Sequence, residues 1–236
     1  MNGEAERAAF RFLMRSPLLH ADMLSALSLG IAEILSAGED GVLLNFGSGY
    51  MMSALNSAAA DAMLGMISTT ELLEVHQKFY VEEMREKYGL GNIIECRQAS
   101  YTEKGLLPQV PSPAEIRPVG EDFLPFVMRH YTHADSNGED YLRGRLGSGD
   151  FFGAFVGGKP AGFIGMHEEG SIGLLEVLPE YRRKGIASAL AVFQTNRILA
   201  QGRVPFSQIE PGNAASFALH RRLGFEISQE SIFWLF

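Results

Sequence analysis

Apolar and polar positions follow a different rhythm in each half of the chain. In the first half, apolar side chains such as Leu24, Leu27 and Ile31 recur at the three- and four-residue spacing that is typical of helices. Short apolar runs between turn residues indicate strands. We therefore expect helices over residues 4–15, 18–36 and 70–88 and strands over 42–46 and 93–101.

The second half alternates strands and helices more regularly. Antiparallel strands lead into a strand–helix–strand tail, which indicates a mixed α/β sheet. The segment Gly157-Gly158-Lys159-Pro160 predicts a hairpin turn between two of these strands. The predicted strands cover 116–119, 151–156, 161–167, 173–178, 204–209 and 232–236, and the predicted helices cover 122–131, 140–146, 187–201 and 213–222.

A proline-rich segment, Gly105 to Pro118, separates the two halves. Proline fixes φ and has no backbone N–H, so it disfavours regular helices and strand ladders. We predict two domains, a smaller α/β domain over residues 1–112 and a second domain over 113–236. Most of the acidity lies in the first, whose net charge is −6 against −2 for the second.

Composition narrows the class of protein. The 236 residues are 46% hydrophobic with a formal net charge of −8, which excludes a generally basic nucleic-acid binder and a disordered acidic chain. His20, Asp22 and Glu33 interrupt the longest apolar stretch, so we expect no membrane segment and no membrane partner. The single Cys96 allows no internal disulfide and no thiolate metal site. We interpret it as a small core residue of a cytoplasmic protein without a metal.

The clearest chemistry lies between Leu174 and Leu190. An apolar strand ends at Pro179, three consecutive cations follow, and a helix opens beyond Gly185. The first N–H groups of a helix have no partner within it, and the helix dipole favours negative charge there. A solvated basic turn is the alternative. We expect a pyrophosphate site made by Arg182, Arg183, Lys184, Gly185, Ala187 and Ser188.

This segment resembles a known signature. Arg182-x-x-Gly185-x-Ala187 after Val177-x-Pro179 is similar to the acetyl-CoA motif of the GNAT superfamily of N-acetyltransferases, and Asn213 to Phe225 is similar to its second motif. Pro205–Gln208 and Phe233–Leu235 look most like its glycine N-acyltransferase-like branch. The resemblance covers about residues 114–236. It implies a mixed sheet that is splayed open between its fourth and fifth strands, with acyl-CoA in the split and flanking helices.

The resemblance also implies which residues hold the cosubstrate. Main-chain groups at Val177 and Leu178 would contact the pantetheine arm, and the diphosphate would lie on Arg182 to Ser188, Ile186 included. Asn213 and Ser216 would contact the cofactor arm from the second motif, although helix N-capping explains Asn213 equally well. A bulge in the fourth strand would aim an N–H at the thioester carbonyl.

Acyl transfer to an amine needs a base and is helped by an acid. We favour Glu176 as the base because it lies on the strand beside the implied thioester; a solvent-facing strand carboxylate is the alternative. His220 occupies the place where many family members carry a tyrosine acid, and imidazole can donate a proton near neutrality. A helix-surface histidine is the alternative there. His167, Glu168 and Glu169 are weaker candidates, since a charged turn is expected at that place.

Together these features predict an N-acyltransferase that moves an acetyl or other short acyl group from acetyl-CoA or another acyl-CoA to a primary amine of a small molecule or amino acid. The alternative is a non-catalytic acyl-CoA sensor or interaction module with the same fold. The first half resembles the degenerate first half of some glycine N-acyltransferase-like proteins. It could cover the acceptor site or mediate self-association as a homodimer.

Overall fold

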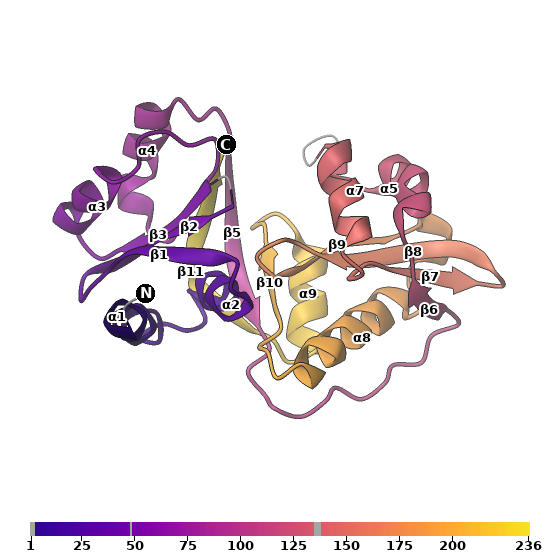
Figure 1. Ribbon diagram of the computed structural model, residues 1–236. Helices are drawn as coiled ribbons and strands as arrows, with labels where there is room; N and C mark the ends of the chain where they lie inside the picture. Colours follow the sequence, from indigo (N-terminus) through magenta and orange to yellow (C-terminus); the bar gives the residue numbers. More distant parts are fainter. Residues whose placement is uncertain (1–2, 48, 135–137) are drawn as a thin grey trace. The chain divides into compact units, whose positions relative to one another are not determined.

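The computed structural model describes residues 3–47, 49–134 and 138–236 (Figure 1). It divides into two compact units. The first unit contains residues 1–100, 208–221 and 225–236, and the second contains 101–207 and 222–224. The structure therefore differs from a single division after residue 112, because two segments near the C-terminus belong to the first unit.

A mixed sheet forms the centre of the first unit (Figure 1). Its first three strands pair antiparallel, β3 and β4 pair in parallel, and β11 runs antiparallel to both β4 and β5. The last strand of the chain thus lies inside a sheet made mostly by the first half. The strand order is β1 (Ala32–Ala37), β2 (Gly41–Phe46), β3 (Gly49–Ala54), β4 (Leu73–Val75), β11 (Glu226–Leu235), β5 (Ile93–Ser100) and β10 (Phe206–Ile209).

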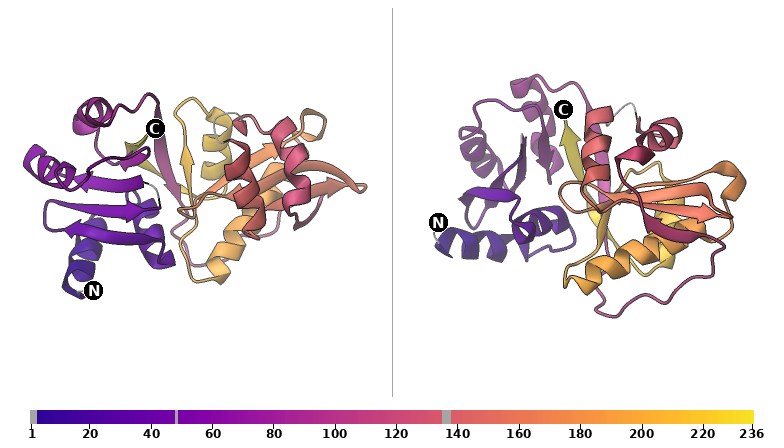
Figure 2. Two further views of the ribbon diagram at one scale, coloured as in Figure 1. Left: turned by 45° about the horizontal axis from the view of Figure 1, so that its top comes forward. Right: turned by 45° about the vertical axis from the view of Figure 1, so that its right-hand side comes forward.

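Helices cover both faces of this sheet, as Figure 2 shows. Helices α1 (Gly3–Leu13) and α2 (Ala21–Leu29) pack with Val42 and Leu44 on one face. Helices α3 (Ser57–Leu64) and α4 (Val81–Tyr88), with the short 3₁₀ helix η1 (Lys78–Tyr80), pack with Leu43 on the other. Successive side chains of a strand point to opposite faces, so the apolar run in β2 fills both cores. Cys96 is buried against Leu19 and Ile232, as predicted.

Two predicted helices in the first half are partly wrong. The helix predicted over residues 18–36 ends at Leu29, because Gly30 adopts the left-handed conformation with φ of 68° and closes it. Ile34 and Leu35 then belong to β1 and pack against the opposite faces of the sheet. In the helix predicted over 70–88, the residues before Val81 include strand β4, which pairs with β3 and β11.

A buried polar network lies in the core of the first unit. His76 Nε2 lies 2.9 Å from Asp22 Oδ1, and both side chains are fully buried. Gln208 donates to Glu74 (2.9 Å) and accepts a bond from the Trp234 indole (2.7 Å). Ligand atoms of Asp22, Glu74 and His76 lie within 4.8 Å of one another, and hydrogen bonds from His76 and Gln208 reach the two carboxylates. The network ties β10 and β11 to the N-terminal strands.

The second unit contains a four-stranded antiparallel sheet in the order β6 (Glu115–Pro118), β7 (Phe152–Val156), β8 (Lys159–Met166) and β9 (Ile172–Val177). Helices α5 (Leu124–His130) and α7 (Glu139–Gly147), with η2 (Glu121–Phe123), pack around Phe151 and Phe163. Helix α8 (Ile186–Ala200) follows η3 (Pro179–Tyr181) and contacts β8 and β9.

Strand β9 lies at an edge of the four-stranded sheet, whereas β10, the next strand along the chain, belongs to the other sheet. The chain therefore leaves β9 unpaired on one side, as expected for a sheet that is splayed open after this strand. The predicted elements of the second half agree with those observed, apart from a few residues at their ends and a longer last strand. None of the helices in the described ranges is long and apolar enough to cross a membrane.

The position of β11 gives a first testable prediction. A fragment of residues 1–112 lacks the strand that pairs with both β4 and β5, so two strand edges and the core beneath them would be exposed. We expect this fragment to show no cooperative thermal transition by circular dichroism, in contrast to the full chain. A cooperative melt of the fragment would contradict the central role of β11.

Buried His20 gives a pH-dependent prediction. Its Nδ1 lies 3.1 Å from the Leu13 carbonyl oxygen and its Nε2 lies 2.9 Å from the Ser53 hydroxyl. Burial, followed by nearby His76, lowers the pKa of His20 from 6.5 to about 4. The unfolded chain therefore binds this proton at a higher pH than the folded chain does. The free energy of unfolding should fall between pH 6.5 and about 4, by up to about 3 kcal/mol from this group.

Denaturant unfolding at pH 7.5, 5.5 and 4.5 checks this prediction. The variant His20→Gln should lose less stability on acidification than the wild type does. The matched control is His133→Gln, since His133 is exposed. Equal pH dependence in the wild type and His20→Gln would refute the role given to His20.

Candidate functional site

The start of helix α8 has the geometry of an anion site. Gly185 directly precedes the helix in the left-handed conformation, with φ of 80°, and no side chain caps the first turn. A Cβ atom at this position would lie 2.5 Å from the carbonyl oxygen of Pro111. Glycine is therefore required by both the conformation and the space. The first N–H groups of α8 have no partner within the helix, so they can bind an anion.

The three cations before Gly185 differ in what they contact. Lys184 donates to the Glu180 carbonyl oxygen at 3.0 Å, and its Nζ lies 5.4 Å from the centre of the Tyr181 ring. Arg183 has a positive φ of 59°, which is rare for a residue with a side chain. Within the described ranges its guanidinium makes no hydrogen bond or ion pair. Backbone strain of this kind is often found at ligand-binding loops.

Arg182 turns back onto β9. Its Nε donates to the Val177 carbonyl oxygen at 2.9 Å, and its Nη2 lies 3.3 Å from Glu176 Oε1. The sequence predicted a phosphate contact for Arg182 and a cosubstrate contact for the Val177 main chain. In this structure the Arg182 side chain instead bonds to the Val177 carbonyl oxygen and to Glu176, and so holds the end of β9.

The carboxylate of Glu176 lies between two donors. Its Oε2 accepts a hydrogen bond from the Thr132 hydroxyl at 2.7 Å, and its Oε1 faces Arg182. Only 14% of the side chain is exposed, unlike a solvent-facing strand carboxylate. Thr132 was not found from the sequence, because nothing in the pattern marks the segment after α5 as a neighbour of β9.

Strand β9 contains the bulge that the resemblance implied. Phe163 pairs with Glu176 and Gly165 pairs with Gly173, so β9 has one residue more than β8 between these pairs. Leu174, within this bulge, has a positive φ of 49°. A bulge redirects the side chains and main-chain groups of its strand. Leu178, just beyond β9, donates its N–H to Ala161 at 2.9 Å.

In the first turn of α8, Ile186 faces the core and Ser188 contacts a further cation, Arg222. Ile186 is 1% exposed and anchors the helix, so only its main chain can contact a ligand. Ser188 Oγ lies 2.6 Å from Nη2 of Arg222. Arg222, which is 34 residues from Ser188, was not predicted as a site residue. The basic pair before Leu223-Gly224-Phe225 was the sequence feature that could have indicated it.

Helix α9 (Ala214–Arg222) carries the other predicted residues. Asn213 Oδ1 accepts the Ser216 N–H at 3.0 Å, which is the N-cap bond expected for an asparagine there. Asn213, Ser216 and His220 belong to the first unit, whereas Val177 to Ser188 belong to the second.

His220 is buried, and its ring meets Phe225 edge-on. Its Nδ1 lies 2.8 Å from the Ser216 carbonyl oxygen, so this nitrogen carries a proton and donates. Burial lowers the pKa of His220. The neutral ring then has its acceptor nitrogen at Nε2, which is the wrong tautomer for donating a proton from that atom.

The contacts in the turn after β8 favour a structural turn over a catalytic role for its residues. His167 Nδ1 lies 2.6 Å from the Tyr141 hydroxyl, and burial lowers the pKa of this histidine to about 4. Tyr141 therefore shares a hydrogen bond with a neutral ring. Ser171 donates to the carboxylate of Glu169. These contacts explain His167 and Glu169 as structural residues of the turn.

Part of the chain matches a known protein family. Residues 158–234 match the family described as FR47-like protein. This segment is therefore similar to an FR47-like domain. It includes the edge strand β9, the cationic loop and helices α8 and α9.

Two curated relatives match over a shorter segment. They are the L-methionine sulfoximine/L-methionine sulfone acetyltransferases of Pseudomonas paraeruginosa and Pseudomonas aeruginosa, each 51% identical over 53 residues. The match covers 22% of this chain and 31% of each relative. The chain thus spans about a third of the length of the curated relatives it matches.

Solved structures resemble the chain over nearly its full length. A Drosophila protein has a TM-score of 0.71 at 14% identity and covers 98% of this chain and 95% of its own. A GNAT-family protein from Novosphingobium aromaticivorans has a TM-score of 0.57 at 17% identity, and a GCN5-related N-acetyltransferase from Kribbella flavida has 0.56 at 14%. Each of these two covers 91% of this chain and 94% of its own. The predicted GNAT-like mixed α/β fold is confirmed.

Arg183 provides a test of the anion site. Its guanidinium forms no hydrogen bond or ion pair within the described ranges, so Arg183→Ala should leave the melting temperature unchanged. A charge-assisted contact to phosphate contributes about 1.4 kcal/mol, so coenzyme A should bind about tenfold more weakly. Isothermal titration calorimetry with coenzyme A measures this, and Lys184→Ala, whose amine already bonds within the loop, is the matched control. Unchanged affinity in Arg183→Ala would remove this residue from the site.

Proposed function

We propose that the chain is an N-acyltransferase that moves an acetyl or other short acyl group from acyl-CoA to the primary amine of a small molecule or amino acid. The observation that carries this proposal is the uncapped start of α8 at left-handed Gly185, directly after the bulged edge strand β9. The FR47-like match over residues 158–234 and the GNAT-like fold support it.

The residues present fit an acyl-CoA. Its diphosphate needs positive charge and free N–H groups, which Arg183 and the first turn of α8 offer, and Gly185 leaves the backbone bare. Arg222 adds a cation at Ser188. The amides of the pantetheine arm can pair with the open edge of β9 near Val177. No metal takes part in the proposed reaction.

Glu176 is the proposed base. Hydrogen bonds from Arg182 and Thr132 hold its carboxylate in place. The neutral amine attacks the thioester carbonyl carbon, the C–S bond breaks with its electron pair on sulfur, and the amine proton passes to Glu176 directly or through water. A main-chain N–H freed by the bulge at Leu174 would stabilise the oxyanion that forms during attack.

Thiolate is a fair leaving group, so the proposed reaction needs no side-chain acid. The sequence suggested His220 for that role, but burial lowers its pKa and so favours the neutral ring, and the hydrogen bond to the Ser216 carbonyl places the remaining proton on Nδ1. We therefore assign proton acceptance to Glu176 and leave the acid step to solvent.

The names of the relatives support a choice of acceptor class. Their names describe acetyl transfer to L-methionine sulfoximine and L-methionine sulfone, both of which are amino acids with one primary amine. A small amino-acid-like amine is accordingly the proposed acceptor of this chain.

For the first half we propose a degenerate GNAT-like half. The order β1–β2–β3–α3–β4–α4–β5 repeats the order β7–β8–β9–α8–β10–α9–β11. In the first half, however, β3 and β4 pair in parallel, which closes the place where β9 and β10 are separated. Asn56 caps the start of helix α3, and its Oδ1 accepts the Ala59 N–H at 2.9 Å. A capped helix beside a closed sheet offers no cosubstrate site.

Glu176→Gln tests the proposed mechanism. It keeps the shape and the bond to Thr132 but cannot accept a proton, so kcat should fall by about 10² to 10⁴ with acetyl-CoA affinity unchanged. Free thiol release over a panel of amines that includes L-methionine sulfoximine measures turnover. The matched control is Glu180→Gln, an exposed carboxylate in the adjacent η3 helix.

Three outcomes separate the hypotheses. Wild-type activity in Glu176→Gln at every pH would exclude this base. Acyl-CoA binding without turnover of any amine would favour the non-catalytic sensor. No thermal stabilisation by acetyl-CoA or longer acyl-CoAs would overturn the acyltransferase proposal, since a ligand at a hundred times its Kd adds about 2.7 kcal/mol.

A further inference from the structure

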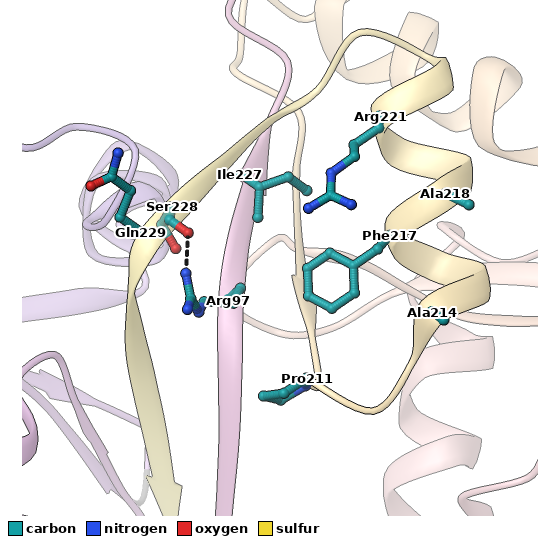
Figure 3. Close-up of a pocket in the computed structure, with 9 residues that line it drawn as sticks. All are labelled: Arg97, Pro211, Ala214, Phe217, Ala218, Arg221, Ile227, Ser228 and Gln229. Carbon is teal, nitrogen blue, oxygen red and sulfur yellow. Dashed lines mark hydrogen bonds between the residues drawn. The ribbon is translucent and has the colours of Figure 1, made fainter.

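A cavity of about 600 Å³ lies within the first unit (Figure 3). One wall is helix α9, with Ala214, Phe217 and Arg221, and the others come from β5 and β11. Its volume falls in the range of small-molecule sites, about 300 to 1,000 Å³. None of the residues discussed above as a cosubstrate contact or as the base lines it.

The wall from β11 is a hydrogen-bonded bulge. Ile227 pairs with Ala99 and Ser231 with Arg97, so β11 has two extra residues in this stretch. Ser228 Oγ accepts the Gln98 N–H at 3.0 Å and donates to the Glu230 carbonyl oxygen at 2.7 Å. These bonds hold the bulge in one conformation. Bulges are often found beside functional sites, where they redirect side chains, and this one is fixed by its own hydrogen bonds.

Two arginines supply the charge of the cavity. Arg97 Nη1 donates to the Ser228 carbonyl oxygen at 2.7 Å, which fixes the guanidinium and uses one of its five N–H donors. Arg221 approaches from α9, with its Cζ 5.5 Å from the centre of the Phe217 ring. Within the described ranges neither arginine forms an ion pair with a carboxylate. In a chain with a formal charge of −8, two such cations in one cavity indicate an anionic ligand.

The rest of the lining is apolar and small. The half-buried Phe217 ring offers a flat face, and Ala214, Ala218 and Pro211 leave room beside it. Stacking on such a face suits a planar ring, and guanidinium suits a carboxylate or phosphate. We propose that this cavity binds a small organic anion with a flat aromatic ring.

This site is separate from the proposed acyl-CoA site. Adjacent residues of a helix point in directions about 100° apart, so neighbouring side chains serve different surroundings. Arg222 donates to Ser188 in the second unit, whereas Arg221 lines the cavity in the first. The two neighbouring arginines thus contribute to two different sites.

The experiment uses the full chain and defined probes. Benzoate carries a carboxylate, and phenyl phosphate and AMP carry a phosphate, while benzamide and adenosine are their uncharged counterparts. Binding is titrated by ligand-observed NMR and calorimetry, with and without saturating coenzyme A. The variants are Arg221→Ala, Arg97→Lys and Phe217→Ala. The matched control is Arg85→Ala, an exposed arginine of the same unit.

We expect at least one anionic probe to bind saturably, and its uncharged counterpart to bind at least tenfold more weakly. Arg221→Ala and Phe217→Ala should each weaken the probe at least fivefold, with the melting temperature unchanged, and Arg85→Ala should have no effect. Which anion binds better, carboxylate or phosphate, identifies the ligand class. Coenzyme A should leave the affinity unchanged.

Several results would overturn the proposal. These are no saturable binding of any probe, equal binding of charged and uncharged probes, wild-type affinity in both Arg221→Ala and Phe217→Ala, or displacement of every probe by coenzyme A. Because Arg221 is exposed and forms no hydrogen bond to a backbone group of residues 3–47, 49–134 or 138–236, its variant tests binding without disturbing the fold.

Discussion

The candidate site depends on one short stretch of backbone, the turn between β9 and α8. Left-handed Gly185 admits the Pro111 carbonyl, leaves the first turn of the helix uncapped and lets the chain follow directly from an edge strand. A residue with a side chain would have an unfavourable φ at this position, and its Cβ would lie too close to the Pro111 carbonyl oxygen. The two arginines before it have different contacts. Arg182 bonds to the end of β9 and to Glu176, whereas the Arg183 guanidinium forms no hydrogen bond or ion pair in the described ranges.

The first half of the chain contains a turn at the equivalent place, between β3 and α3. Helix α3 follows β3 as α8 follows β9, but α3 begins at a capping asparagine and β3 pairs directly with the next strand. The two helix starts show how the same order of elements gives a closed structural half or an open half. The difference lies in a side-chain cap and one parallel strand pair rather than in the order of the elements.

Much of the second half could be predicted because its elements are bounded by strong turn signals and its loop combines cations, glycine and a helix start. The first half was harder. Apolar residues at 31, 34 and 35 fit a helix and a strand equally well, and only the pairing of β1 with β2 decides between them. The partners Thr132 and Arg222 were also beyond sequence reasoning, since Thr132 lies 44 residues from Glu176 and Arg222 lies 34 from Ser188. The cavity beside Phe217 depends on a bulge that no sequence pattern marks.

The insertion of β11 has a consequence for how the protein is made. Synthesis runs from the N-terminus at about 5 to 20 residues per second, and domains usually fold as they emerge from the ribosome. Here β4 and β5 are complete long before the strand that pairs with both of them has been translated. The N-terminal half must therefore wait with two open edges until β11 has also been translated and released. Chaperones that shield open strands have their longest opportunity in that interval.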